Sequence, residues 1–354
     1  MMNRTIARLT PNRHGALAIF LIAVLGGSIL AAISWGAAAY PLPQTFSHLW
    51  AWLTGGSIAS DELTDYTVVV DIRTPRVLMA GLVGAGLSAL GIAAQAMVRN
   101  PLADPFILGI SSGASVGASA VVSWGVFSSL GVYALSTAAF AGALIASIVV
   151  YALSRTPQGV APVRLILTGV VLSFGFQALM SAIVFFASRG DAARSVMFWM
   201  LGSLGGATWQ QLPLTAVVTI GCVVYLRAKA SDMDVISMGD GSSASLGVDP
   251  DALRRRLFFV TVLGTATLVS VAGTIGFVGL VIPHLTRIVF GPAHRTATLI
   301  APLLGAIFMI WVDLASRVAT PPRELPLGVV TALFGVPVFI MLLRRRGYVF
   351  GGSR

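Results

Sequence analysis

Ionisable side chains are rare inside the apolar segments of this 354-residue chain, and Asp313 stands out among them. It lies in the apolar segment 298–318, four residues before Arg317. Within a membrane such a carboxylate could relay protons, or it could form an i, i+4 ion pair on one face of a helix. A relay needs paired intramembrane ionisable groups and only Asp313 qualifies, so we expect the structural pair with Arg317.

Nucleophiles and metal ligands are present, but not in working combinations. Ser115 could be imagined as a nucleophile with His284 or His294 as its base. Ser115 sits in Gly-Ala-Ser and the histidines lie near a helix end, so we expect a small packing residue and no hydrolase. Cys222 is the single cysteine, and the four histidines are scattered without metal-ligand spacing. The sequence therefore predicts neither a catalytic site nor a metal site.

The chain also lacks the Gly-x-x-x-x-Gly-Lys-Ser/Thr motif, whose backbone amides cradle phosphates. We therefore expect no enzymatic activity and no cofactor bound by this chain. Any coupling to ATP must come from a partner.

The composition indicates which elements must position these residues. Apolar residues make up 56% of the chain and charged residues only 10%, against about 25% charged in soluble domains. Segments 15–40, 106–153 and 257–283 carry no charge, and about 20 apolar residues are enough to span a bilayer. The pattern predicts an all-α polytopic membrane protein with a single domain, residues 1–354. The ten expected spans are 15–38, 76–98, 106–124, 130–153, 163–187, 210–227, 257–274, 276–290, 298–318 and 326–343.

The distribution of positive charge sets the orientation of these spans. With ten spans both termini lie on one side, and that side collects 17 of the 23 Lys and Arg residues. Lys and Arg favour the cytoplasmic side, so both termini are predicted to be cytoplasmic. The net charge of +10 is then a topology signal, and a nucleic-acid-binding role is not needed to explain it.

Two connections are longer than the others. Residues 41–75 form the longer loop on the outer side, and residues 228–256 are the only sizeable polar segment on the inner side. The inner loop is expected to hold two short helices, Met233–Met238 and Ser243–Leu246, with Gly247 ending the second. Such a platform is a natural contact for another protein. A shorter inner corner, RNPLADP at 99–105, has prolines to interrupt the helices and Asp104 to cap the next one.

Four motifs in order resemble the transmembrane permease subunit of bacterial type II ABC importers for iron chelates, haem and vitamin B12. The likeness runs from about residue 66 to residue 346. It implies ten helices per subunit, a homodimer, two ATPase subunits below and a periplasmic binding protein above, in the bacterial inner membrane. The motifs are RTPRVLMAGLVGAGLSALGIAAQAMVRNPLADPFILGISSGA at 73–114, FWMLGSLGGATW at 198–209, GFVGLVIPHLTR at 276–287 and ELPLGVVTALFGVPVFIMLL at 324–343.

The resemblance also implies residue roles. Arg73, Arg76 and Arg317 would receive acidic residues of the binding protein, although Arg323 is close enough to replace Arg317. The fifth span, 163–187, would line the central pathway. Its start, Ala161, Pro162 and Val163, would form the cytoplasmic gate. The loop 228–256 would enter the ATPase through Met233, Ile236, Met238, Gly239, Ser245, Leu246 and Gly247.

The cargo expected from likeness alone is haem, followed by a ferric siderophore and then cobalamin. That preference rests on overall similarity, including SVMFWMLGSLGGATW at 195–209. The competing class is an ion-coupled secondary transporter, which Asp313 alone supports poorly.

Overall fold

The computed structural model describes residues 11–36, 38–156, 159–187 and 190–344. In this part of the chain the fold is helical, apart from one hairpin of two-residue strands, so the all-α prediction is confirmed. The first half contains α1 (Pro11–Ser34), α2 (Leu42–Thr54), α3 (Leu63–Tyr66), η1 (Thr67–Arg73), α4 (Thr74–Met97), η2 (Pro105–Leu108), α5 (Ile110–Trp124), η3 (Ser128–Tyr133), α6 (Ala134–Ser154), β1 (Arg155–Thr156) and β2 (Gly159–Val160). The second half contains α7 (Pro162–Phe185), α8 (Ala192–Met200), α9 (Leu212–Ala228), α10 (Ala230–Ile236), α11 (Asp240–Ser245), α12 (Pro250–Ala272), α13 (Val278–Phe290), α14 (His294–Val318) and α15 (Leu327–Arg344).

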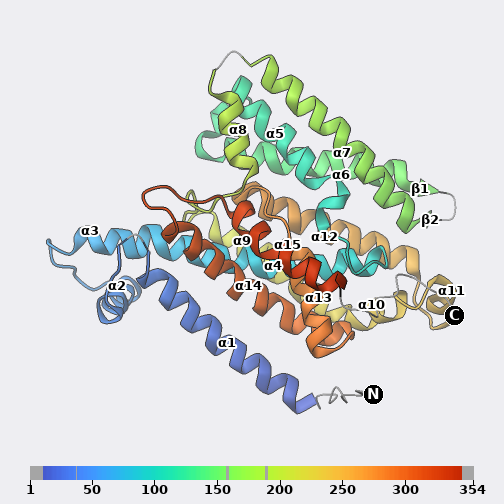
Figure 1. Cartoon of the computed structure of the whole chain (residues 1–354), viewed down its shortest axis with the longest axis horizontal. Coiled ribbons are helices and arrows are strands. Elements are labelled where there is room, and N and C mark those ends of the chain that lie inside the picture. The colour runs from blue at the N-terminus through green and yellow to red at the C-terminus, as the bar shows by residue number, and fades with distance from the viewer. Residues whose placement is uncertain (1–10, 37, 157–158, 188–189, 345–354) are drawn as a thin grey trace.

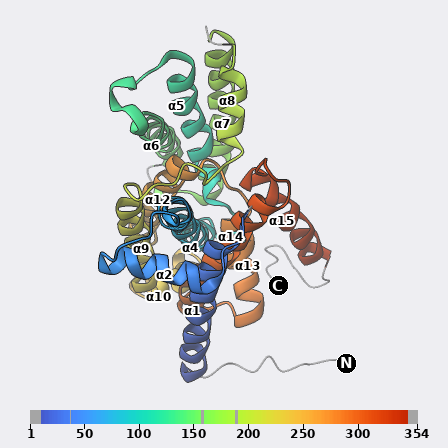
Figure 2. The same ribbon diagram turned by 90° about the vertical axis from the view of Figure 1, so that its left-hand side faces the viewer.

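The long helices lie roughly side by side, with short elements at both ends (Figure 1). We call one end, which carries α2 and α3, the α2 end. The opposite end carries α10, α11 and the β hairpin, and we call it the α10 end. Seen along the bundle from the α2 end, α4, α12 and α14 occupy the centre, and α5 to α8 form a lobe on one side (Figure 2).

The ten spans expected from the sequence fall on α1, α4, α5, α6, α7, α9, α12, α13, α14 and α15. Six of the described helices are long and apolar enough to cross a membrane, or seven if α9 and α10, which meet at a 59° bend, form one span. The others are shorter. Helix α13 has 13 residues, which reach about 20 Å at 1.5 Å per residue, against a hydrocarbon core of about 30 Å.

Several element boundaries differ from those expected. The outer loop 41–75 contains α2, and its last eleven residues before α4, 63–73, are helical and run straight into that helix. Helix α12 begins at Pro250 rather than at residue 257, because the Asp249 carboxylate accepts hydrogen bonds from the next amides and Pro250 suits the first turn. Helix α13 begins at Val278, two residues later than expected, after Phe277 with its positive φ.

Glycines let the central helices meet backbone to backbone. A Cβ on Gly84 of α4 would lie 2.0 Å from the Gly305 carbonyl oxygen of α14, and one on Gly91 would lie 1.9 Å from the Gly279 oxygen of α13. Small residues provide this close approach in membranes, where dispersion contacts hold helices together. Helix α4 is thus fixed against α13 and α14, and most of its residues are buried.

Gly84→Ala should lower the free energy of unfolding by about 1–3 kcal/mol, the usual cost of overpacking a core. Gly26 in α1 offers a matched control, because nothing lies within 4 Å of a Cβ placed there. Gly26→Ala should be neutral or stabilising by up to about 1 kcal/mol, since alanine favours helix. Thermal unfolding in detergent measures both, and equal effects at the two glycines would contradict the close contact.

The corner at 98–109 joins α4 to α5 through η2. The Asp104 carboxylate accepts a hydrogen bond from the Phe106 amide at 2.9 Å, and Gly109 turns the chain with a φ of +76°. Burial raises the pKa of Asp104 to about 6. This is above the unfolded value of about 3.9, so the folded state binds more protons between about pH 4 and pH 6. Stability must therefore fall as the pH rises through that window.

Asp104→Asn should remove this pH dependence while keeping the cap, because asparagine caps helices as well as aspartate does. We expect the variant to gain about 1–2 kcal/mol at pH 7.5, where the wild-type carboxylate is charged. Its stability should be flat between pH 5 and pH 7. Unfolding temperatures recorded across this range test the idea, and a wild-type slope retained in the variant would show that another group titrates.

Candidate functional site

A buried cluster of charged side chains lies at the α2 end, where α4, α14 and the segment before α15 meet. Nε of Arg76 donates to Oδ1 of Asp313 at 2.8 Å, and its terminal nitrogens donate to the two oxygens of Glu324 at 2.7 and 2.8 Å. Asp313 is fully buried and Arg76 is 6% exposed. The planar fork on Glu324 is among the stronger forms of ion pair. Arg76 therefore fastens α4 both to α14 and to the loop that leads into α15.

Arg317 joins the cluster from α14 itself. Its Nε lies 3.0 Å from Oδ2 of Asp313, so the i, i+4 pair expected from the sequence is confirmed. The contact between these two atoms is an ion pair. Nη2 of Arg317 donates to the Ala32 carbonyl of α1 at 3.0 Å.

Arg73 reaches the same end of α1. Its Nη1 donates to the carbonyls of Ile33 and Ser34 at 2.9 and 3.1 Å, and its guanidinium lies 4.9 Å from the centre of the Tyr40 ring. The last carbonyls of a helix have no partners within it and carry the negative end of its dipole. Arg73 and Arg317 together cap α1, which explains why two guanidinium groups are buried there.

The docking role expected for Arg73, Arg76 and Arg317 stays a prediction, and the burial of all three argues against it. They are 7%, 6% and 7% exposed, and their nitrogens are engaged inside the chain. Drawing any of them out to meet another protein would leave buried carbonyls or carboxylates without partners, which costs several kcal/mol. Arg323, the alternative left open by the sequence, is exposed instead.

Sequence reasoning misses Glu324 as a member of the cluster, because its partner Arg76 lies 248 residues away. One sequence feature could have identified Glu324: it is the one acidic residue of the ELPLG motif, and it follows Arg323 directly. Hydrogen bonds from the Arg76 guanidinium hold the pKa of Glu324 below its usual range, so the carboxylate is charged at neutral pH. The cluster thus contains three guanidinium groups and the two carboxylates Asp313 and Glu324.

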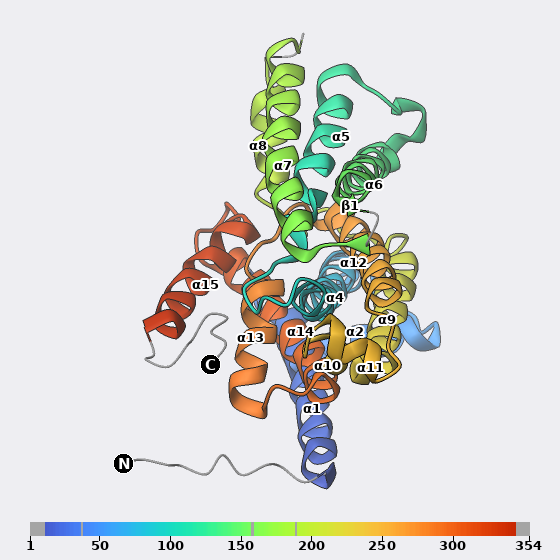
Figure 3. The ribbon, with the colours of Figure 1, turned by 90° about the vertical axis from the view of Figure 1, so that its right-hand side faces the viewer.

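At the α10 end, α10 and α11 form a platform fixed to the long helices (Figure 3). Asp234 of α10 accepts from the His294 amide at 2.9 Å and lies 2.7 Å from Nδ1 of its ring, which ties α10 to the start of α14. The Ser243 hydroxyl of α11 donates to the Val235 carbonyl at 3.0 Å. Asp240 receives both terminal nitrogens of Arg254. These bonds hold both short helices in one position.

The two short helices differ from those expected. Helix α10 ends at Ile236, so Met238 lies in the link, and α11 covers Asp240–Ser245, so Leu246 follows it. Met233 and Ile236 are fully buried and anchor α10 to this chain. Their expected role as contacts for a partner stays a prediction. Met238 and Leu246 are 67% and 61% exposed. Gly239, Ser245 and Gly247 lie around them on the platform.

The residues expected at the gate stand at the start of α7. Ala161 caps the helix, Pro162 is its first residue, and Val163 is 68% exposed. Along the whole of α7 only Leu165, Gly169 and Ile183 are buried. Helix α7 packs against α5 and α6 along one face, and an apolar helix with its remaining faces exposed has surface that its own described chain does not cover.

A small cavity of about 160 Å³ lies between α7 and α5. Hydroxyl, amide and thioether groups line it, and the Ser112 and Ser173 hydroxyls lie 3.3 Å apart across it. None of its lining residues is charged. These residues are Ser111, Ser112, Ser115, Ser173, Gln177, Met180, Met200 and Thr274.

The fold and these sites define a polytopic membrane subunit with a platform of two short helices at one end. The class is a permease: the non-catalytic, membrane-spanning component of an ABC importer. The chain belongs to the FecCD transport family, whose model matches residues 17–345.

Individual relatives agree with this assignment. The chain is 38% identical over 97% of its length to an uncharacterised ABC transporter permease, YvrB of Bacillus subtilis, covering 97% of that protein. It is 41% identical over 80% of its length to the cobalamin import system permease BtuC of Halobacterium salinarum, covering 75% of it. A solved metal-chelate-type ABC transporter in an inward-facing conformation matches with a TM-score of 0.80 and 28% identity, covering 93% of this chain and 99% of that one.

Proposed function

We propose that this permease imports a metal chelate, either cobalamin or a ferric siderophore, across the bacterial inner membrane. The observation that carries the proposal is family membership over nearly the whole chain, together with relatives named for these two kinds of cargo. BtuC of Halobacterium salinarum is described as a cobalamin permease, and FecD of Escherichia coli, 35% identical over 93% of this chain and 98% of that protein, as a ferric dicitrate permease. Neither of these relatives is named for haem, the cargo expected first from the sequence.

The pathway is proposed to form between two copies of the chain. Helices α7 and α15 flank the same side of the bundle (Figure 3), and both expose large apolar side chains. Phe174 of α7 is 69% exposed and Leu333 of α15 is 66% exposed. A two-fold dimer is the commonest closed arrangement, and it would cover both faces while enclosing the serine-lined cavity. In that dimer Ala161, Pro162 and Val163 would sit near the axis, as a gate requires.

The platform is proposed to face the cytoplasm and to receive one ATPase subunit per permease. This orientation follows the Lys and Arg bias and places both termini on the cytoplasmic side. The periplasmic binding protein would then dock at the α2 end, where Arg323 is the exposed arginine beside the buried cluster. ATP and Mg²⁺ would be used by the ATPase, not by this chain.

Uptake into proteoliposomes tests the cargo. The chain is reconstituted with its ATPase, and the binding protein is added with cobalamin, a ferric siderophore or haem. We expect ATP-dependent uptake of cobalamin or the siderophore at least tenfold above that of haem, and no ATP hydrolysis by the permease alone. Preferential uptake of haem would overturn the proposed cargo, and uptake driven by an ion gradient without ATPase would overturn the transporter class.

A further inference from the structure

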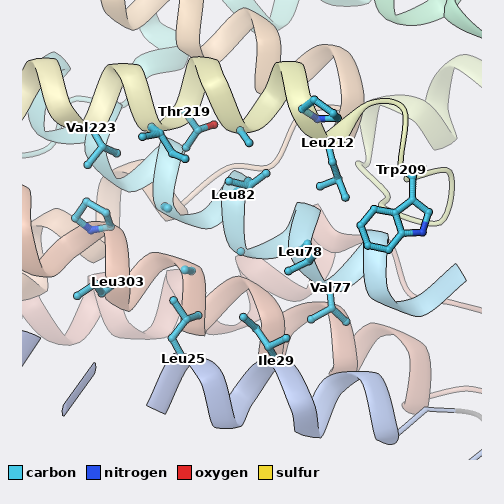
Figure 4. A pocket seen from close by; sticks show the side chains of 17 residues that line it. Leu25, Ile29, Val77, Leu78, Leu82, Trp209, Leu212, Thr219, Val223 and Leu303 are labelled. Carbon is cyan, nitrogen blue, oxygen red and sulfur yellow. The ribbon is translucent and has the colours of Figure 1, made fainter. Parts of the chain in front are cut away.

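An apolar groove of about 600 Å³ runs between α1, α4, α9 and α14 (Figure 4). Leu25 and Ile29 of α1 point towards it from one side, and Leu212 and Val223 of α9 from the other. The groove extends along α9 from the level of Trp209 to that of Val223. The twelve helical residues from Leu212 to Val223 correspond to about 18 Å. Because these helices are embedded in a bilayer, the material available to fill such a groove is hydrocarbon.

Both walls of the groove lead to an arginine at the α10 end. On α9 the lining residues Ala216, Ile220 and Val223 recur every three or four positions, and the next position in this series is Arg227. On α14, Ala306 and Pro302 line the groove, and the same face continues towards Arg295 at the start of the helix. The two arginines therefore lie beyond the same end of the groove.

The two arginines are also neighbours in space. Nη1 of Arg227 donates to the backbone carbonyl of Arg295, and Nε of Arg295 donates to the Ser231 hydroxyl at 3.1 Å. Both side chains are exposed. Within the described part of the chain no carboxylate lies within 4 Å of either guanidinium, although nearby Lys229 is paired with Asp232. Two adjacent cations at the end of an apolar groove, neither of them in a described ion pair with a carboxylate, match a phosphate joined to acyl chains.

We propose that this groove is a binding site for an anionic phospholipid, with one acyl chain between α1 and α9 and the phosphate at Arg227 and Arg295. The acyl chain would cover the apolar side chains that α1, α4, α9 and α14 present to the groove. This inference depends on membrane embedding alone, and it stands whatever the cargo proves to be.

Native mass spectrometry of the purified complex tests the site, with phosphatidylglycerol and a phosphatidylcholine of identical chains as probes. We expect one phosphatidylglycerol retained per permease, at least tenfold tighter than the phosphatidylcholine. Arg227→Gln with Arg295→Gln should abolish that preference. Arg255→Gln with Arg256→Gln, which removes two exposed charges at the same end but away from the groove, should leave it unchanged. Equal binding of both lipids, or equal effects of the two double variants, would overturn the proposal.

A phosphatidylglycerol with a photoreactive acyl chain locates the hydrocarbon in the unmodified complex. Cross-linked peptides should come from α1 and α9, and Ala216→Phe with Ala306→Phe should block the labelling. Labelling confined to α7 or α15 would overturn the assignment. It would also be overturned if the correctly folded Ala216→Phe, Ala306→Phe variant bound the lipid with unchanged affinity. If another part of the chain fills the groove, no lipid will be retained, and this result would also overturn the proposal.

Discussion

Met238→Asp combined with Leu246→Asp should abolish transport and ATPase-coupled activity while the helical bundle stays folded. Both side chains are more than half exposed on a platform that hydrogen bonds hold in place. If they enter an apolar cleft of the ATPase, two buried carboxylates without partners would cost several kcal/mol of binding free energy, or at least about a hundredfold in affinity. Pull-down of the ATPase and substrate-stimulated ATP hydrolysis measure this loss.

Two matched variants separate contact from folding. Met238→Leu with Leu246→Met keeps an apolar surface and should retain at least half of the wild-type transport rate. Met233→Asp with Ile236→Asp places charge in the core beneath α10, so it should lower stability and yield as well as coupling. A soluble, correctly folded Met238→Asp, Leu246→Asp permease that still binds the ATPase normally would remove this platform from the interface.

Asp313→Asn should be the most destabilising single change at the α2 end. The carboxylate is fully buried between Arg76 and Arg317, with 2.8 and 3.0 Å separations. Removing one partner from a buried ion pair typically costs about 3–5 kcal/mol, because the remaining charge is left uncompensated. Here Arg317 would lose the one carboxylate within 4 Å of it in the described part of the chain. Thermal unfolding in detergent should show the loss directly.

The neighbouring residues provide the comparison for Asp313. Glu324 has a side chain that is 42% exposed, and Arg76 would still have Asp313 as a partner without it, so Glu324→Gln should be milder than Asp313→Asn. Arg323→Gln should leave stability unchanged but weaken association with the binding protein at low salt, if that arginine docks it. Equal destabilisation by Asp313→Asn and Arg323→Gln would show that burial does not determine how much each charged residue contributes to stability.

Long apolar segments and charge bias were enough to predict the helical class and the approximate place of the spans. Boundaries were harder wherever polar residues continue a helix, as in the LTDY segment before α4 and the first turn of α12. The capping signal Asp249-Pro250 was available for α12. The three consecutive arginines at 254–256 lower the hydropathy of this segment, and they favoured a loop over a helix in the sequence analysis. A helix can nevertheless carry such residues, because their long side chains reach into water.

The candidate site was predicted less well than the fold, because residue type does not reveal burial. Arg73 and Arg76 are charged and sit near an expected loop, which suggested an open docking surface. Their partners are carbonyls about 40 residues away and a carboxylate 237 residues away, and single-sequence spacing carries no information on such contacts. Met238 and Leu246 were expected as contacts and are exposed, while Met233 and Ile236, chosen on the same grounds, are not.

The backbone contacts of α4 with α13 and α14 have a mechanical consequence. Where carbonyl oxygens meet glycine Cα atoms directly, no layer of side chains can repack to let one helix slide past another. We therefore expect these three helices to move as one rigid block during a transport cycle. Helix α7 differs, because it is tied near its start by Gly169, where a Cβ would lie 1.9 Å from the Ile107 oxygen, whereas Gly175 meets nothing within 4 Å. We therefore expect alternating access to use α7 as a lever that pivots near Gly169, with spin-label distances changing along α7 but not between α4 and α14.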